Sequence, residues 1–307
     1  MNPKIRQTVL PFIAATLWGI SFVFQKESTK LLGPFTFSAL RTLLGFLVLV
    51  LFILFRNKVL RMPDSTPIKS KTLWIGGISC GTVLFVATNL QQFGLVDTDA
   101  GKAAFITALY IVLVPVFGLF LKKKVQPIIW ISVLVAVVGM YFLCIKTGLT
   151  IEMGDVLILL CAIAFAVQIL VVDKYASLVD GVKLSCIQML TSGTLSLIFA
   201  ILTEKIELSA VIDCAVPILY LGIFSSGVAY TLQVVAQKGT NPTVVSLILS
   251  LESVIGAIAS AIALHERLLP REYIGSALML VAVVLAQLPE NLFKRKRINK
   301  NGGTLNK

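Results

Sequence analysis

The sequence predicts an all-α integral membrane protein in which ten transmembrane helices form two inverted five-helix repeats. Composition is the first observation: 57% of the 307 residues are hydrophobic and 14% are charged, whereas about 25% of the residues in soluble proteins are charged. The second is a succession of apolar runs near the roughly 20 residues that a helix needs to cross a bilayer. The third is a weak internal repeat, which relates the two halves of the chain.

The apolar runs are interrupted by few charges. Arg41 lies within the second run and Glu252 within the ninth. Prolines stand near the start of several runs, at Pro34, Pro127, Pro242 and Pro270, where a helix can begin without losing a hydrogen bond. The ten predicted spans are residues 7–25, 31–55, 72–96, 103–121, 125–145, 156–172, 184–203, 214–237, 239–265 and 273–289.

The first run resembles a signal peptide because Lys4 and Arg6 precede it. It is long, however, and it ends in Gln25-Lys26-Glu27 without a small-residue cleavage site. We therefore interpret it as the first span.

Basic residues predict the orientation, because Lys and Arg accumulate in cytoplasmic loops. With the N-terminus inside, 19 of the 27 Lys and Arg fall on the cytoplasmic side and seven on the outer side. We expect a plasma membrane protein with both termini in the cytoplasm.

The net charge of +12 does not indicate nucleic acid, because the basic residues lie between apolar runs and in the tail. The tail is interpreted as a topology anchor, although such a cluster can also attract anionic lipid.

The two halves of the chain repeat each other. Residues 86–121, shifted by 142 positions, lie on residues 228–263 with eight of 36 positions identical. Each half contains five spans, an odd number, so the halves run through the membrane in opposite directions, as in many secondary transporters. The predicted units are a first repeat (1–150), a second repeat (151–290) and a basic cytoplasmic tail (291–307).

Several short motifs occur in an order that is characteristic of one family. They are Trp18-Gly19 within residues 14–22, Arg41, the run 107–115, the run 251–257 and His265-Glu266-Arg267. On these motifs the chain resembles the EamA-type branch of the drug/metabolite transporter superfamily. It departs from that pattern at Ser253, where many members carry proline, and at residues 122–124, which are lysines rather than Gly-Glu-Arg.

The resemblance implies a central cavity and transport of amino acids, related metabolites or drugs. We therefore expect a secondary transporter that moves a small metabolite by alternating access, with amino acids as the best single guess and proton coupling as an open question. A small-molecule substrate and the lipid bilayer are the expected partners. No cofactor, catalytic residue or metal site is expected, and a monomer is sufficient.

Charges deep in a span usually face the bundle interior or a wet cavity, because a charge at the span centre costs roughly 2.5–3.5 kcal/mol. Glu252 is a candidate for a proton-coupling group, since burial disfavours a charged carboxylate. Its alternative is a structural role, with Arg41, hydroxyls or backbone groups as partners. Arg41 is a candidate for binding a substrate carboxylate with its fork of donors. Its alternative is an ion pair that ties two helices together.

Other polar and aromatic residues within the spans are candidates for a cavity lining. For the amides the alternative is hydrogen bonding between helices, at about 0.6 kcal/mol each, and for Trp18 it is plain packing. The predicted substrate-binding or cavity-lining residues are Trp18, Arg41, Asn89, Gln92, Tyr110, Gln168, Tyr230, Gln233 and Gln237.

Two other functions are considered beside transport. An intramembrane enzyme acting on lipids would need a nucleophile, a metal cluster or paired carboxylates, but the chain has one histidine and five cysteines without CxxC spacing. A non-transporting membrane scaffold or receptor would normally carry a large soluble domain, and the longest loop is the short basic stretch near residues 56–72. Both are less consistent with the sequence than a transporter is.

Overall fold

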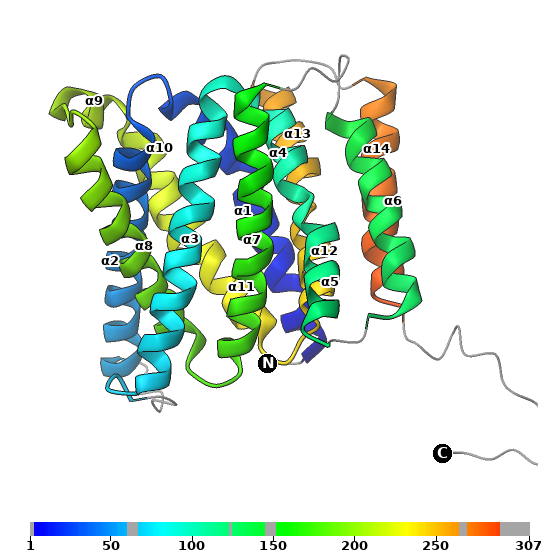
Figure 1. Cartoon of the computed structure of the whole chain (residues 1–307), viewed down its shortest axis with the longest axis horizontal. Coiled ribbons are helices and arrows are strands. Elements are labelled where there is room, and N and C mark those ends of the chain that lie inside the picture. The colour runs from blue at the N-terminus through cyan, green and yellow to red at the C-terminus, as the bar shows by residue number, and fades with distance from the viewer. Residues whose placement is uncertain (1–2, 60–66, 123–124, 145–151, 264–268, 289–307) are drawn as a thin grey trace, which may run out of the picture.

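A computed structural model gives the architecture (Figure 1) and describes residues 3–59, 67–122, 125–144, 152–263 and 269–288. The predicted tail, the boundary at residue 150 and the His265-Glu266-Arg267 motif lie outside these residues. The helical elements are α1 (Pro3–Ser28), α2 (Pro34–Lys58), α3 (Lys71–Asp97), α4 (Ala100–Ala108), α5 (Tyr110–Phe120), α6 (Pro127–Cys144), α7 (Met153–Ala176), α8 (Gly181–Thr203), α9 (Leu208–Asp213), α10 (Ala215–Tyr220), η1 (Leu221–Ala229), α11 (Tyr230–Gln237), α12 (Pro242–Leu249), α13 (Glu252–Ala263) and α14 (Pro270–Ala286).

The ten predicted spans are confirmed as helical, and the fold is an all-helical membrane bundle. Over the described ranges, eight helical passes are long and apolar enough to cross a membrane, and α6 and α14 are shorter. A helix of 17 residues such as α14 is about 26 Å long at 1.5 Å per residue. It is therefore somewhat shorter than the roughly 30 Å hydrocarbon core.

Helix starts follow the sequence signals. Pro34, Pro242 and Pro270 each occupy the first turn of a helix. Asp180 and Asn241 accept hydrogen bonds from the first backbone N–H groups of α8 and α12. The first backbone N–H groups of a helix have no partner within it. Proline lacks this N–H group, and the Asp and Asn side chains accept hydrogen bonds from it. The bundle therefore has sharply defined ends on both sides.

The two halves pack on each other as related copies. The second spans of the halves, α2 and α8, contact each other, and so do the fifth spans, α6 and α14. In addition, α3 packs against α7 and α8, while its counterpart, η1 with α11, packs against α1 and α2. The chain begins and α14 ends at the same edge of the bundle, the lower edge in Figure 1. These relations are those of two inverted repeats around a pseudo-twofold axis.

Three spans are not continuous α-helices, which the sequence did not predict. The fourth is interrupted at Leu109 and the ninth at Ser250 and Leu251. The backbone N–H of Leu109 donates to Ile106 O at 3.2 Å, and that of Leu251 donates to Ile248 O at 3.2 Å. Both bonds are of the tighter i→i+3 type, so the helix narrows locally and changes direction. Leu109 and Leu251 are equivalent under the 142-residue shift, so both halves break at the same place.

The eighth span contains the π-helix η1, nine residues long. Its sequence is rich in small residues, and Gly222 and Gly227 lie against Leu44 and Val48 of α2. Short π segments occur mostly at functional sites, because they widen the helix and re-aim side chains. The equivalent part of α3 is a regular α-helix, so this feature distinguishes the second repeat from the first.

Candidate functional site

A pocket lies between the two repeats, where the interrupted fourth and ninth spans approach each other. The pocket is small beside the roughly 300–1,000 Å³ usual for small-molecule sites. The positions open to the centre of a water molecule amount to about 30 Å³, so side chains must move apart to admit a solute. The lining residues are Trp18, Phe22, Gln25, Arg41, Gln91, Thr107, Tyr110, Phe165, Ile169, Ser225, Tyr230, Gln233, Leu249 and Glu252.

Arg41 supplies a cation to this pocket. Its side chain is among the largest that are fully buried, with 2% exposure, and its guanidinium carbon lies 5.8 Å from the centre of the Phe37 ring. Within the described part of the chain, its Nε and Nη2 atoms have no hydrogen-bond acceptor. A buried charge without partners costs several kcal/mol. The site is therefore incomplete without an acceptor.

Glu252 lies on the pseudo-twofold axis of the bundle and faces its own counterpart. The Tyr110 hydroxyl donates a hydrogen bond to Glu252 Oε1 at 3.1 Å, and these two positions are 142 residues apart. Glu252 is 4% exposed and begins α13, directly after the break in the ninth span. Across the described residues Arg41 and Glu252 form no ion pair with each other. The alternative of an ion pair between them is therefore not seen among these residues.

The backbone around Glu252 is held by a close approach of α1 to α13. A Cβ atom added at Gly19 would lie 2.7 Å from Glu252 O and 2.8 Å from Ile255 Cβ. Only glycine fits at this distance. The Trp18-Gly19 pair thus places the indole in the pocket and brings the two helices together.

Further polar atoms around the pocket lack partners among the described residues. They include the donor Nε1 of Trp18 and the acceptors Oε1 of Gln25 and Oε1 of Gln233. The Trp18 and Tyr230 rings pack at 4.7 Å between centroids, and Gln91 Nε2 donates to Thr107 Oγ1 at 3.2 Å. Buried polar groups are normally satisfied. Several unsatisfied groups in one pocket indicate that a ligand or water completes it.

Five of the nine predicted lining residues border the pocket, and so does the coupling candidate Glu252; the five are Trp18, Arg41, Tyr110, Tyr230 and Gln233. The other four predicted residues make hydrogen bonds between or within helices. Asn89 donates to Phe85 O and to Ser196 Oγ of α8, and Gln92 donates to Gln25 O and Ser28 Oγ of α1. Gln168 donates to Gln188 and accepts from Gln233, and Gln237 donates to Ile169 O.

Eight residues border the pocket although the sequence analysis did not select them as lining residues: Phe22, Gln25, Gln91, Thr107, Phe165, Ile169, Ser225 and Leu249. A signal for two of them was present. Residues 18, 22 and 25 recur at i, i+4 and i+7 and so share one helical face, which makes Phe22 and Gln25 neighbours of Trp18. Ser225 faces the pocket from the π-helix, whose register the sequence does not reveal.

A comparison with protein families matches the EamA-like transporter family model to residues 8–145 and again to residues 152–288. The chain belongs to the EamA-like transporter family. It is therefore a multi-pass membrane transporter and not an enzyme.

Two curated relatives are similar along most of their length. An uncharacterized transporter of Archaeoglobus fulgidus is 33% identical over 279 residues, which are 90% of this chain and 84% of that protein. The uncharacterized transporter YvbV of Bacillus subtilis is 24% identical over 306 residues, 97% of each chain. A crystal structure at 20% identity superposes with a TM-score of 0.74 over 92% of this chain and 96% of the other. That likeness shows that the two chains share a fold.

Proposed function

We propose that this EamA-like transporter moves a small zwitterionic metabolite, with an amino acid as the best single guess. The observation that supports this most strongly is that one pocket between the repeats is bordered by a buried cation, Arg41, and a buried acid, Glu252. Two Arg41 nitrogen atoms have no acceptor among the described residues. A solute with one negative and one positive group would complement both. Apolar solutes would leave the donors and acceptors of the pocket unsatisfied.

A carboxylate is the anionic group that fits Arg41. The guanidinium fork matches two carboxylate oxygens, and two of its nitrogen atoms lack acceptors in the described structure. An ammonium group fits Glu252, which accepts from Tyr110 through one oxygen and has further lone pairs available. The free carbonyl oxygens of Gln25 and Gln233 are additional acceptors for N–H groups.

The rest of the pocket is apolar and would hold a side chain. Phe22, Phe165, Ile169 and Leu249 all line it. Burying apolar surface contributes about 25 cal/mol per Å². We therefore expect a substrate with a medium or large apolar side chain to bind better than glycine.

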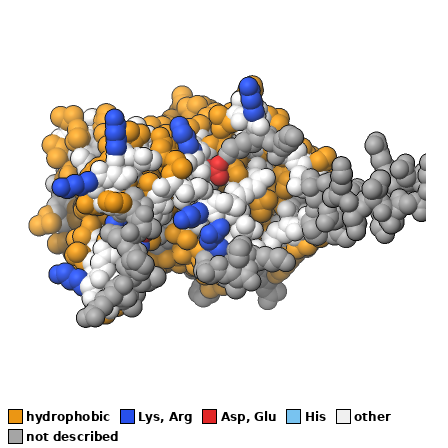
Figure 2. All heavy atoms as spheres, turned by 90° about the horizontal axis from the view of Figure 1, so that it is seen from below, with side chains coloured by type: hydrophobic (Ala, Val, Ile, Leu, Met, Phe, Trp, Pro, Cys, Tyr) orange, Lys and Arg blue, Asp and Glu red, His pale blue; other side chains and the backbone are white. Residues whose placement is uncertain are grey.

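The location of the pocket between inverted repeats supports alternating access, in which the two halves rock around a fixed site. We propose a plasma membrane location with both termini in the cytoplasm. Lys and Arg side chains spread over the face that carries the start of α1 (Figure 2), and acidic side chains are scarce there. The helices α2 and α7 end on this face with Arg56, Lys58 and Lys174. A single chain contains the whole pocket, so a monomer is sufficient.

Leucine and two analogues that each lack one charge test this proposal. Purified protein is heated with leucine, 4-methylpentanoate or isopentylamine, because a ligand that binds the native state raises its apparent melting temperature. Radiolabelled leucine uptake into proteoliposomes is measured with the same compounds as competitors. We expect leucine to stabilise and to be taken up, and both analogues to compete weakly. If isopentylamine competes as well as leucine, the substrate is an organic cation and not a zwitterion. If 4-methylpentanoate competes as well as leucine, the substrate is a simple carboxylate.

A wider panel follows if leucine has no effect. Nucleosides, vitamins and hydrophobic cations cover other polar and amphipathic solutes that this lining could bind. A hit that depends on neither Arg41 nor Glu252 would keep transport as the function and remove both residues from substrate binding.

A further inference from the structure

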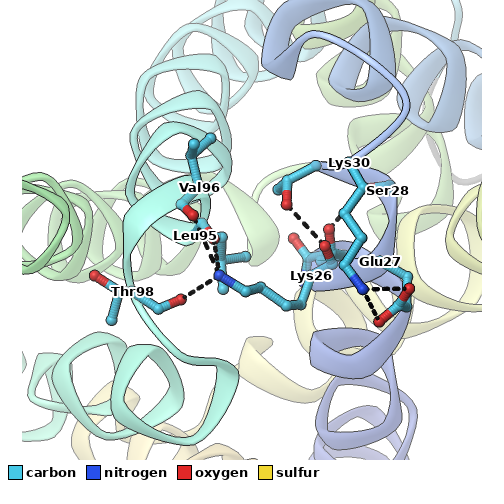
Figure 3. Close-up of polar contacts among 9 residues, drawn as sticks. Lys26, Glu27, Ser28, Lys30, Leu95, Val96 and Thr98 are labelled. Carbon is cyan, nitrogen blue, oxygen red and sulfur yellow. Dashed lines mark hydrogen bonds and ion pairs between the residues drawn. The ribbon is translucent and has the colours of Figure 1, made fainter.

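At the end of the bundle that the proposed orientation places outside, a lysine reaches from α1 to α3. Lys26 Nζ donates to Leu95 O at 2.8 Å, to Thr98 O at 3.1 Å and to Val96 O at 3.2 Å (Figure 3). These carbonyls stand at the C-terminal end of α3, where helix carbonyls lack intrahelical partners and where a cation is favoured by the helix dipole. A side chain of the first span thus caps the third span.

Neighbouring contacts extend this closure to two more helices. Asp155 at the start of α7 accepts from Thr98 Oγ1 at 3.0 Å and from Lys102 Nζ of α4 at 2.5 Å. One layer deeper, Gln92 donates to Gln25 O at 3.2 Å, and Gln25 borders the pocket. The Lys26 contacts therefore lie next to a residue that borders the pocket.

The opposite end of the bundle is different. The positions equivalent to Leu95 and Thr98 under the 142-residue shift are Gln237 and Thr240. Thr240 borders a second cavity, in which about 360 Å³ is open to the centre of a water molecule. Asp173 of α7 and Thr243 of α12 also border it. Where one end of the bundle has a lysine bonded to three carbonyls, the opposite end has a wide recess.

We propose that Lys26 is the latch of the outer gate: its three hydrogen bonds to α3 hold the outer end closed, and they break each time the pocket opens outwards. The inference rests on the proposed alternating-access transport. Such a latch can be reversible, because both the ammonium group and the neutral carbonyls of α3 find water as an alternative partner when the helices part. A buried ion pair would separate at a much greater cost.

Access to the pocket from outside measures the latch without any substrate. Ser225, which lines the pocket, is changed to cysteine, and its reaction with a membrane-impermeant thiol reagent is followed on intact cells. The same protein with Ser225 intact gives the background from the native cysteines. Lys26→Met removes the latch. Lys30→Met is the matched control, because Lys30 is four residues further along and, in the described part of the chain, its side chain forms only an exposed ion pair with Glu27.

We expect Lys26→Met to speed labelling by about tenfold, which corresponds to about 1.4 kcal/mol of lost closure, and Lys30→Met to leave the rate unchanged. Unchanged labelling in a folded Lys26→Met protein would overturn the latch and leave Lys26 as a cap of α3. Fast labelling of the parent protein would also overturn it, because the outer end would then already be open. If Lys26→Met does not fold, Lys26→Gln, whose amide is too short to reach all three carbonyls, is expected to speed labelling in the same way.

Failure of the proposed substrate gives a different result. Leucine uptake absent from every variant, together with faster labelling of Lys26→Met, would remove the amino-acid proposal and keep the latch. Labelling is repeated on inside-out vesicles, where the reagent reaches the inner face. A rise confined to these vesicles would place Lys26 on the cytoplasmic side and overturn its assignment to the outer gate.

Discussion

Replacement of Arg41 by methionine tests the assignment of the pocket most directly, because the substitution removes the charge and keeps most of the volume. In the protein without ligand, the guanidinium is buried and two of its nitrogen atoms lack acceptors among the described residues. A buried ion without partners costs several kcal/mol. We therefore expect Arg41→Met to raise the apparent melting temperature of the empty protein.

Ligand binding should change in the opposite direction. Removing one partner of a buried, hydrogen-bonded charge pair costs roughly 2–5 kcal/mol. A loss of about 3 kcal/mol corresponds to a dissociation constant about 150-fold higher. The thermal shift that leucine produces in the parent protein should then disappear at the same leucine concentration.

Arg56→Met is the control on the same helix. Arg56 Nη1 lies 2.9 Å from Asp180 Oδ2, and both side chains are nearly buried, with 11% and 12% exposure. Loss of this partnered arginine should lower the melting temperature and leave the dissociation constant unchanged. The reasoning is refuted if Arg41→Met also lowers the melting temperature and binds leucine as tightly as the parent, since Arg41 would then be a structural residue.

Three further predictions concern coupling, packing and capping. Glu252→Gln keeps an acceptor for the Tyr110 hydroxyl but cannot exchange a proton. Uptake driven by a pH gradient should therefore be lost. If this variant still shows pH-driven uptake, coupling through Glu252 is ruled out. Gly19→Ala places a methyl group 2.7 Å from Glu252 O and should lower the free energy of unfolding by about 1–3 kcal/mol. At the control position Gly101, no atom lies within 4 Å of an added Cβ, so Gly101→Ala should be neutral or slightly stabilising. Equal melting temperatures of the two variants would contradict that close approach. Glu204 accepts hydrogen bonds from two backbone N–H groups at the start of α2, so Glu204→Ala should lower the free energy of unfolding by about 1 kcal/mol. The control Glu207→Ala removes no capping bond and should leave the free energy of unfolding unchanged. An equal loss in both would show that the cap is not the cause.

The spans could be predicted because apolar length alone determines them. Arg41 and Glu252 could be identified for the same reason, since a charge far from a helix end has few places to go other than the bundle interior. Their separation could not be predicted. The sequence shows that both are deep, but the distance between two helices depends on packing that no local pattern encodes.

The amides of the third span illustrate the limit more closely. Gln91 and Gln92 are adjacent, and successive residues of a helix point about 100° apart. Both are polar, so composition does not decide which one faces the cavity. The sequence analysis selected Gln92, but the structure places Gln91 on the pocket and uses Gln92 to tie α3 to α1. The π-helix and the two helix breaks were missed for a related reason, since they depend on contacts with other helices.

The contact between Tyr110 and Glu252 has a consequence for how such a bundle can be built. These positions lie on the symmetry axis, so in an assembly of two identical subunits each residue at this point would meet its own copy. Two facing carboxylates 3.1 Å apart, the separation seen here, could not both be charged, and two facing phenols would provide no acid at all. Joining the halves in one chain removes this restriction, because each copy of the position can then change independently. A single polypeptide can therefore set an acid against a hydroxyl at the one place where identical subunits must match.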